Sequence, residues 1–215
     1  MSVTAKICGL NSPEAVEAAI SGGASHIGFV FYPRSPRAVS AEQARALISA
    51  APAPVTTVGL FVNASDSDIE TILAAAPLKM LQLHGGESPE RVAAIKERFG
   101  LPVMKAISVA EANDVNQAHL YLESADWLLF DAKPPATMKD ALPGGNAVAF
   151  DWSLMAARQW LLPWMLAGGI TVDNVAQAVA QAGADVIDVS SGVEDAPGVK
   201  NPTKITEFLA AVATL

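Results

Sequence analysis

Short apolar runs alternate with amphipathic, alanine-rich stretches along most of the chain. The runs are rich in β-branched residues, as buried parallel strands are, and the stretches between them suit crossover helices. Eight such strands favour an α/β fold, a (β/α)8 TIM barrel with a parallel eight-stranded core, in which residues 1–215 form a single domain. The predicted strands are Thr4–Cys8, Ser25–Phe31, Thr56–Val62, Lys79–Leu83, Pro102–Ile107, Trp127–Asp131, Pro163–Leu166 and Ala184–Asp188.

Polar capping residues mark where several of the intervening helices begin and end. Ser12-Pro13-Glu14 and Ser88-Pro89-Glu90 each offer a serine N-cap, a first-turn proline and an early acidic residue. Asp66-Ser67-Asp68 offers caps and negative charge for a third helix. Gly22-Gly23 and Gly183 follow alanine-rich stretches and predict where two helices stop.

An open, doubly wound sheet would show a similar alternation of strands and helices. That fold usually follows its first strand with a glycine-rich fingerprint, whereas this chain continues as Cys8-Gly9-Leu10-Asn11-Ser12-Pro13. The length of 215 residues, 51% of them hydrophobic, suits one compact barrel. The barrel is therefore the preferred interpretation.

Charge and composition narrow the function classes. A formal net charge of −8 without clustered Lys and Arg argues against nucleic-acid binding. The first residues do not resemble a signal peptide, and no apolar run approaches membrane-spanning length, so no membrane partner is expected. The single cysteine, Cys8, excludes an internal disulfide and a multi-cysteine zinc site. These features predict a cytoplasmic protein, and the sequence leaves open whether it is a monomer or a homodimer.

Two predicted strands near the C-terminus end in small residues, at Gly168-Gly169 and at Ser190-Ser191-Gly192. Backbone N–H groups at such ends can converge on an anion, and (β/α)8 barrels often hold phosphate between the loops after strands 7 and 8. Each motif alone is more commonly a simple glycine turn. The two in tandem favour a phosphorylated small molecule as the ligand.

Ionisable residues are few at the other predicted strand ends, which makes Cys8 and Asp131 stand out. Cys8 could be a small buried hydrophobe, but Lys6 shares its strand face, and a neighbouring ammonium favours a thiolate. Asp131 could cap a helix or pair with Lys133; partly desolvated, it could serve as a general acid. A base and an acid on different strands suit proton transfer, which needs no cofactor.

Three further polar positions belong to the candidate site. His84 could be a metal ligand, a proton donor or a packed polar side chain; the metal interpretation ranks lowest because His26 and His119 are badly placed to help. Of Arg34 and Arg37, one could grip a carboxylate and the other is expected to be exposed. Neither a metal nor a cofactor is predicted. The long loop at residues 133–147 is interpreted as a functional loop.

Several blocks together resemble the phosphoribosylanthranilate isomerase family, nearly from end to end. They are Lys6-Ile7-Cys8-Gly9, Gly28–Phe31 leading to Ser35-Pro36-Arg37, Val58–Asn63, Gln82-Leu83-His84-Gly85, Ala167-Gly168-Gly169 and Asp188–Glu194. The resemblance implies an Amadori rearrangement of N-(5-phosphoribosyl)anthranilate in tryptophan biosynthesis.

The same resemblance implies roles for individual residues. Asp131 would be the general acid that protonates the furanose ring oxygen, and Cys8 would take the C2′ proton. Arg37 would face the anthranilate carboxylate, while His84 and Asp188 would line the pocket. The phosphate would lie in a cradle made by the residues Gly168, Gly169, Ser190, Ser191 and Gly192.

One position departs from the family pattern, and three other functions compete with the isomerase. Ala147 stands where family members usually have glycine, which would strain the backbone if φ is positive there. A metal-dependent sugar-phosphate epimerase would need several inward His and Asp ligands, and a histidine-pathway isomerase would be expected to end its first strand in aspartate rather than Cys8. A non-catalytic binder of a phosphorylated ligand would keep the cradle without needing the acid and base.

Overall fold

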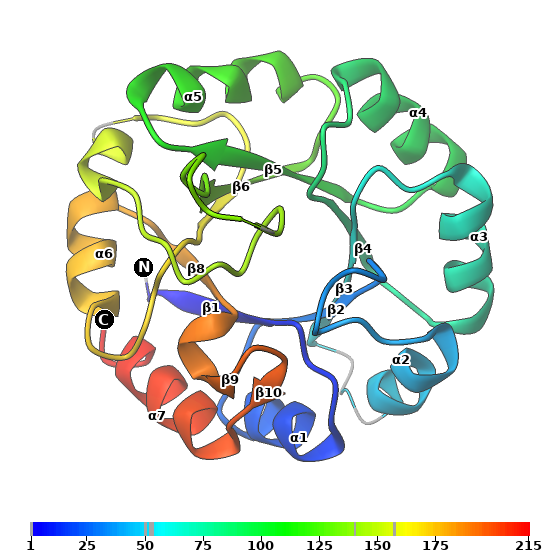
Figure 1. Ribbon diagram of the computed structural model, residues 1–215, viewed down its shortest axis with the longest axis horizontal. Coiled ribbons are helices and arrows are strands. Elements are labelled where there is room, and N and C mark those ends of the chain that lie inside the picture. The colour runs from blue at the N-terminus through cyan, green and yellow to red at the C-terminus, as the bar shows by residue number, and fades with distance from the viewer. Residues whose placement is uncertain (1, 50, 52–53, 140, 157) are drawn as a thin grey trace.

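The centre of the computed structural model is a closed barrel of eight parallel strands (Figure 1). The structure describes residues 2–49, 51, 54–139, 141–156 and 158–215. Each strand pairs with its neighbours in the sequence, and the last strand closes the barrel by pairing Asp188 with Lys6 of the first. The predicted α/β barrel is therefore confirmed. The strands are β1 (Thr4–Cys8), β2 (His26–Val30), β3 (Thr56–Phe61), β4 (Met80–Leu83), β5 (Val103–Val109), β6 (Trp127–Ala132), β7 (Trp164–Leu166) and β8 (Val186–Val189).

Helices form a ring outside the strands (Figure 1). Their bounds are α1 (Pro13–Ser21), α2 (Ala41–Ile48), α3 (Asp66–Ala75), α4 (Pro89–Phe99), α5 (Ala112–Asn116), η1 (Gln117–Tyr121), η2 (Trp152–Met155), α6 (Val175–Ala182), η3 (Ser191–Val193) and α7 (Pro202–Val212). Between β6 and β7, the described residues form a long loop and the short 3-10 helix η2 instead of an α-helix. Among the described residues, no helix is long and apolar enough to cross a membrane.

The helix ends follow the capping chemistry of the sequence, with one shift. The hydroxyls of Ser12 and Ser88 accept hydrogen bonds from backbone N–H groups at the starts of α1 and α4, as predicted. The third N-cap is Ser65, one residue before the predicted group, and it forms a capping box with Asp68. Gly183 ends α6 in the left-handed region, with a φ of 68°.

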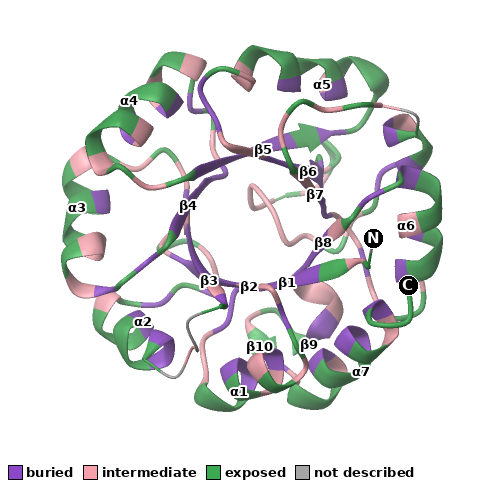
Figure 2. Ribbon diagram, turned by 180° about the vertical axis from the view of Figure 1, so that it is seen from behind, coloured by how far each residue is buried: buried purple, intermediate pink, exposed green. Residues whose placement is uncertain are grey.

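The two faces of the barrel sheet are packed differently. Outward side chains such as Ile7, Leu81 and Phe130 are fully buried against the helices, whose barrel-facing residues are buried too (Figure 2). Inward side chains fill the amino-terminal part of the barrel with a separate apolar cluster that includes Met80 and Met104. Because side chains alternate along a strand, the polar residues farther along lie on this same inner face.

A small antiparallel hairpin follows the eighth strand, and the sequence pattern did not predict it. It consists of β9 (Glu194–Ala196) and β10 (Val199–Lys200). Its strands lie beside α1 and α7, outside the barrel (Figure 1). The hairpin places Glu194 and Lys200 close to the carboxyl ends of the barrel strands, where the polar residues gather.

Candidate functional site

A pocket lies at the carboxyl ends of the strands, covered by the loop that follows β6 and crosses the barrel mouth in Figure 1. Its lining includes residues from widely separated parts of the chain. Of the predicted site residues, it brings together Cys8, Arg37, His84, Asp131, Gly168, Gly169, Asp188, Ser190 and Ser191. Gly192 does not line it; a Cβ there would lie 2.0 Å from the backbone oxygen of Ile170, so this glycine allows η3 to pack closely.

Cys8 is buried at the end of β1, beside an ion pair that joins the adjacent strands β1 and β8 inside the barrel. Lys6 Nζ lies 2.8 Å from Asp188 Oδ1, and Lys6 is fully buried. Burial lowers the pKa of Lys6, but attraction by Asp188 and Cys8 outweighs it, so the net pKa is raised and the ammonium is retained.

The protonation of Cys8 differs from the expectation that Lys6 would favour a thiolate. Burial raises the pKa of the Cys8 thiol more than Lys6 lowers it, and the nearby Asp188 carboxylate raises it further. The resting group is therefore a thiol, and its conjugate thiolate is a stronger base than that of an exposed cysteine. Lys6 is shared with Asp188, which weakens its effect on the sulfur.

Asp131 and His84 face each other across the pocket floor. Asp131 Oδ2 lies 3.2 Å from His84 Nε2, at ion-pair distance but without hydrogen-bond alignment, so Nε2 has no hydrogen-bond partner in the described chain. The amide nitrogen of Gln82 lies 2.9 Å from His84 Nδ1, so Gln82 contacts the imidazole at the ring nitrogen that does not face Asp131. Lys133, the alternative partner considered for Asp131, pairs with Asp114 instead.

The loop after β6 approaches these side chains through glycine backbone. A Cβ on Gly144 would lie 2.6 Å from Asp131 Oδ2 and 2.8 Å from His84 Nε2, and one on Gly145 would lie 2.6 Å from Arg37 Nη1. Side chains larger than hydrogen at either position would push the loop away from the pocket. Residues 142–148 of this loop line the pocket.

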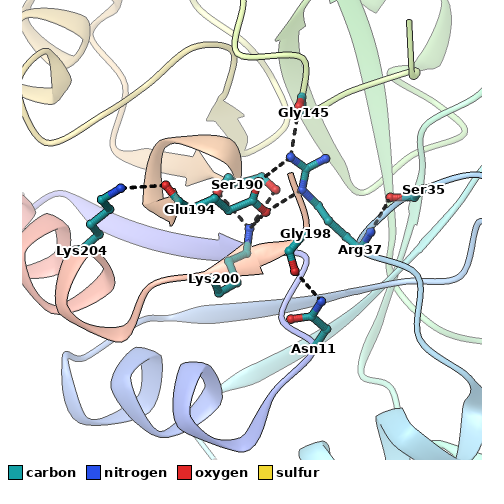
Figure 3. Close-up of polar contacts among 9 residues, drawn as sticks. All are labelled: Asn11, Ser35, Arg37, Gly145, Ser190, Glu194, Gly198, Lys200 and Lys204. Atoms are coloured by element: carbon teal, nitrogen blue, oxygen red, sulfur yellow. Dashed lines mark hydrogen bonds and ion pairs between the residues drawn. The ribbon is translucent and has the colours of Figure 1, made fainter. Parts of the chain in front are cut away.

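Arg37 is buried, and Arg34 is exposed, which resolves the choice between the two arginines. The guanidinium forms a two-pronged pair with Glu194, with Nε 2.8 Å from Oε1 and Nη2 2.7 Å from Oε2 (Figure 3). Nη2 also donates to the backbone oxygen of Gly145. Among the described residues, Nη1 has no hydrogen-bond acceptor, and Arg37 lines the pocket.

The loops that follow β7 and β8 present backbone and serine hydroxyls to the pocket. Gly168 and Gly169 have φ values of 87° and 63°, and a Cβ on either would lie 2.7 Å from a backbone nitrogen of a neighbouring segment. Ser190 and Ser191 belong to the same lining. Lys200 Nζ donates to the backbone oxygen and to Oγ of Ser190, at 2.9 and 3.2 Å.

The remaining histidines lie away from this pocket. His26, at the amino end of β2, packs against the Trp127 ring, and His119, on η1, packs against the Trp160 ring. Within the part of the chain that the structure describes, no group of three or more His, Cys, Asp or Glu side chains could hold a metal ion.

Sequence reasoning did not assign Gln82, Glu194 or Lys200 to the site, although each contacts a residue that it did assign. Glu194 lies 157 positions from Arg37, and no local pattern reveals such a pair. Gln82 carries a weak signal, because two-residue alternation puts it on the same strand face as His84.

Parallel strands that close into a barrel, with ionisable side chains and glycine backbone gathered at their carboxyl ends, define a (β/α)8-barrel enzyme. The chain matches, over residues 5–211, the family model described as N-(5'phosphoribosyl)anthranilate (PRA) isomerase. It belongs to this family.

Relatives and solved structures agree with this membership. An N-(5'-phosphoribosyl)anthranilate isomerase from Cereibacter sphaeroides is 54% identical over 97% of this chain and 98% of its own length. The phosphoribosyl anthranilate isomerase from Thermotoga maritima has a TM-score of 0.87 at 36% identity, over 99% of this chain and 100% of its own. A crystal structure of a phosphoribosyl anthranilate isomerase in complex with reduced 1-(o-carboxyphenylamino)-1-deoxyribulose 5-phosphate has a TM-score of 0.83 at 33% identity, with the same coverage.

Proposed function

We propose that the protein catalyses the Amadori rearrangement of N-(5-phosphoribosyl)anthranilate to 1-(2-carboxyphenylamino)-1-deoxyribulose 5-phosphate, a step of tryptophan biosynthesis. The observation that carries the proposal is that a buried thiol and a buried carboxyl, Cys8 and Asp131, line one pocket in a chain of this family. They come from β1 and β6, so a substrate can lie between them. The reaction is an isomerisation by general acid and base catalysis and requires no cofactor.

The acid step opens the sugar ring. Asp131 donates a proton to the furanose ring oxygen, the bond from that oxygen to C1′ breaks, and the nitrogen lone pair forms an iminium at C1′. The carboxylate left on Asp131 lies 3.2 Å from His84 Nε2. The Gln82 contact at Nδ1 holds the His84 ring beside Asp131, and with its proton on Nε2 the ring would stabilise the new charge after a small movement.

The base step moves a proton from carbon. Cys8, as the thiolate, removes the proton from C2′, and the electron pair forms the C1′–C2′ double bond of an enolamine while the iminium nitrogen becomes neutral. Tautomerisation of the enol to the ketone completes the product without a net change in atoms. The raised pKa of Cys8 gives a small thiolate population with high basicity, and Lys6 stabilises the charge on the sulfur.

Binding groups for the two charged ends of the substrate lie on different parts of the pocket lining. Arg37 would pair with the anthranilate carboxylate, since a guanidinium recognises carboxylates well. His84 and Asp188 would line the space between the two ends. The phosphate would be cradled by backbone amides and hydroxyls of Gly168, Gly169, Ser190 and Ser191, whereas Gly192 lies outside the pocket lining.

The test follows the loss of anthranilate-type fluorescence when the purified protein meets freshly generated phosphoribosylanthranilate, with EDTA present and a downstream synthase to remove product. Rapid decay that EDTA does not affect, and that Asp131→Asn reduces by roughly 10² to 10⁴, is the expected result. Decay no faster than the background would leave a phosphate-binding barrel without this activity. Decay that requires a divalent ion would favour a metal-dependent epimerase chemistry.

We further propose that residues 1–215 act as one domain, as a cytoplasmic monomer or homodimer that takes a phosphorylated small molecule and has no nucleic-acid or membrane partner. The free, buried thiol of Cys8 suits a reducing compartment. Sedimentation equilibrium at micromolar concentration separates the two assembly states.

A further inference from the structure

Three charged side chains outside the acid and base pair form one buried cluster: Arg37, Glu194 and Lys200 (Figure 3). Their exposed fractions are 4, 9 and 7%. Glu194 Oε1 accepts from Arg37 Nε and from Lys200 Nζ, at 2.8 and 2.6 Å, and Oε2 accepts from Arg37 Nη2 at 2.7 Å. Both oxygens of the carboxylate are therefore used within the cluster.

The contacts within the cluster oppose the effect of burial on its charged groups. Burial raises the pKa of Glu194, but hydrogen bonds from Arg37 and the charge of Lys200 outweigh it, and the net pKa lies below the ordinary value. Burial and the charge of Arg37 lower the pKa of Lys200; the Glu194 carboxylate opposes that change only in part, and the net pKa lies below the ordinary value. Two basic side chains thus share one carboxylate beside the pocket.

Glu194 also fixes the direction in which the guanidinium faces. The planar group is held at Nε and Nη2 by the carboxylate, and Nη2 also donates to the Gly145 oxygen at 3.2 Å. The stem of Arg37 packs on Gly9, where a Cβ would lie 2.7 Å from Cδ. With the stem and two nitrogens held, Nη1 is left for a pocket ligand.

Lys200 links the Glu194 carboxylate to Ser190, at the end of the pocket where the phosphate is expected. Its ammonium contacts Glu194 and both the backbone oxygen and the hydroxyl of Ser190. The hairpin β9–β10 supplies both Glu194 and Lys200, and it is tied to the barrel by Asn11, which donates to the Gly198 oxygen at 2.8 Å (Figure 3). One hairpin therefore contacts the residues expected at both charged ends of the substrate.

We propose that Glu194 is a positioning residue that orients Arg37 toward the carboxylate of the substrate, and that Lys200 positions Ser190 for the phosphate in the same way. This inference rests on the proposed function. It adds that Glu194 and Lys200, from one hairpin, position the groups that bind the carboxylate and the phosphate of the substrate. A pair that only stabilises the fold would lower the melting temperature and leave ligand recognition by the folded enzyme unchanged.

The test of Glu194 is the Glu194→Gln variant, measured by steady-state kinetics and by binding of the reduced product analogue. We expect KM and the dissociation constant to rise by roughly 10- to 50-fold with kcat within about threefold of wild type, because uniform binding is lost. An analogue without the ring carboxylate should bind wild type and variant equally. Equal losses for both analogues, or an unchanged KM, would overturn the positioning role.

Two further variants keep this test decisive. In an Arg37→Met background, Glu194→Gln should add less than about twofold to the dissociation constant, because the group that it positions is gone. Asp195→Asn is the matched control: its carboxylate is the next one along β9 but is exposed and pairs with Lys204, so wild-type KM is expected. If Glu194→Gln does not fold, Glu194→Asp, which keeps the charge, should give the same selective loss in smaller measure.

Lys200→Met tests the phosphate end, with inorganic phosphate as a competitive inhibitor. We expect the inhibition constant of inorganic phosphate to rise severalfold. The difference in affinity between the analogues with and without the ring carboxylate should change less than in Glu194→Gln. An unchanged inhibition constant would remove Lys200 from this role while leaving that of Glu194. If wild type shows turnover and the variants do not differ from it, this inference alone fails; absence of turnover in wild type overturns the proposed function and this inference with it.

Discussion

The same eight strands form the outer and inner faces of the barrel sheet, but the two faces carry different kinds of side chains. The outer face is mostly apolar, as Ile7 and Phe130 illustrate, and it packs against the buried faces of the helices. Lys105 of β5 is a charged exception on this face, buried and paired with Glu87. The inner face holds an apolar cluster toward the amino ends of the strands, with His26 beside it, and becomes mostly ionisable farther along, where Lys6 and Asp188 form a buried pair.

Because of this difference between the two faces, neighbouring residues of one strand can serve different purposes, one stabilising the fold and the next lining the pocket. Adjacent positions of one strand point to opposite faces, so β1 carries Ile7 toward the helices and Cys8 toward the pocket, and β6 does the same with Phe130 and Asp131. A change on the outer face should therefore alter the free energy of unfolding, and a change on the upper inner face should alter the rate.

The strongest test of this separation compares two neighbouring residues of β1. Cys8→Ser should lower kcat by roughly 10² to 10⁴, because a serine hydroxyl ionises far less readily than a thiol and so supplies almost no anionic base. Its effect on stability should be small. Ile7→Ala should destabilise the protein by about 2–5 kcal/mol, since it leaves a cavity at a fully buried site, with kcat of the folded enzyme unchanged. Fluorescence turnover and urea unfolding measure the two quantities.

The result would contradict the separation if the two variants lost activity and stability in the same proportion. Turnover by Cys8→Ser close to that of wild type would also remove Cys8 from its proposed role. The corresponding pair on β6, Phe130→Ala and Asp131→Asn, repeats the comparison at the acid.

The outer face was predictable from the sequence, and the inner site was predictable in part. Apolar runs and capping residues are local signals, so the eight strands and the N-caps Ser12 and Ser88 follow from them. Cys8 and Asp131 could be singled out because polar groups at the ends of apolar strands are rare and topology brings those ends together.

Two kinds of information had no local signal. Glu194 meets Arg37 across 157 positions, through a hairpin whose strands are too short to show a β pattern. The direction of the Cys8 pKa depends on how deeply the sulfur is buried and on Lys6 being shared with Asp188. The alternation of side chains along a strand predicts neither how deeply the Cys8 sulfur is buried nor that Lys6 also pairs with Asp188.

A smaller effect on the rate is expected from changes to the buried ion pair of Lys6 and Asp188, which lies beside Cys8. The rate should rise with pH as Cys8 loses its proton, and Lys6→Met removes the charge that lowers the pKa of this thiol. The rising limb of kcat/KM against pH should therefore move to higher pH, and the rate near neutral pH falls about tenfold for every pH unit by which the limb moves. A stopped-flow pH profile measures this displacement.

The control for this prediction is Asp188→Asn, which keeps Lys6 and removes a carboxylate that raises the Cys8 pKa. It should move the limb in the opposite direction, to lower pH. Limbs that coincide in wild type and both variants would show that the titrating base is a group other than Cys8.

At the amino end of the inner face, the expected effect is on stability and depends on pH. Burial and the charge of Lys6 lower the pKa of His26 to about 4, so below pH 6.5 the unfolded chain takes up a proton that the folded protein does not. Stability should thus fall as the pH drops from about 6.5 toward 4, by at most about 3 kcal/mol. His26→Gln should flatten urea-unfolding free energies across that interval, while His119→Gln, at an exposed position, should keep the wild-type slope.

The smallest expected effect concerns the loop that covers the inner face. Ala147 has a φ of 56°, in the left-handed region that favours glycine, so the departure from the family pattern does fall on a strained backbone position. Ala147→Gly should relieve about 1 kcal/mol of strain and raise the melting temperature by about 2–4 °C, with kcat nearly unchanged.

Ala149→Gly is the matched control for this last substitution, because it lies in the same loop, is exposed and does not have positive φ. There the same chemical change should destabilise by about 0.4–1 kcal/mol, since glycine adds freedom to the unfolded chain without relieving strain in the folded one. Opposite signs two residues apart would assign the effect to backbone conformation at Ala147. Equal signs would mean that the loop tolerates either residue, and that its position over Asp131 is set by Gly144 and Gly145, where a Cβ would meet the site directly.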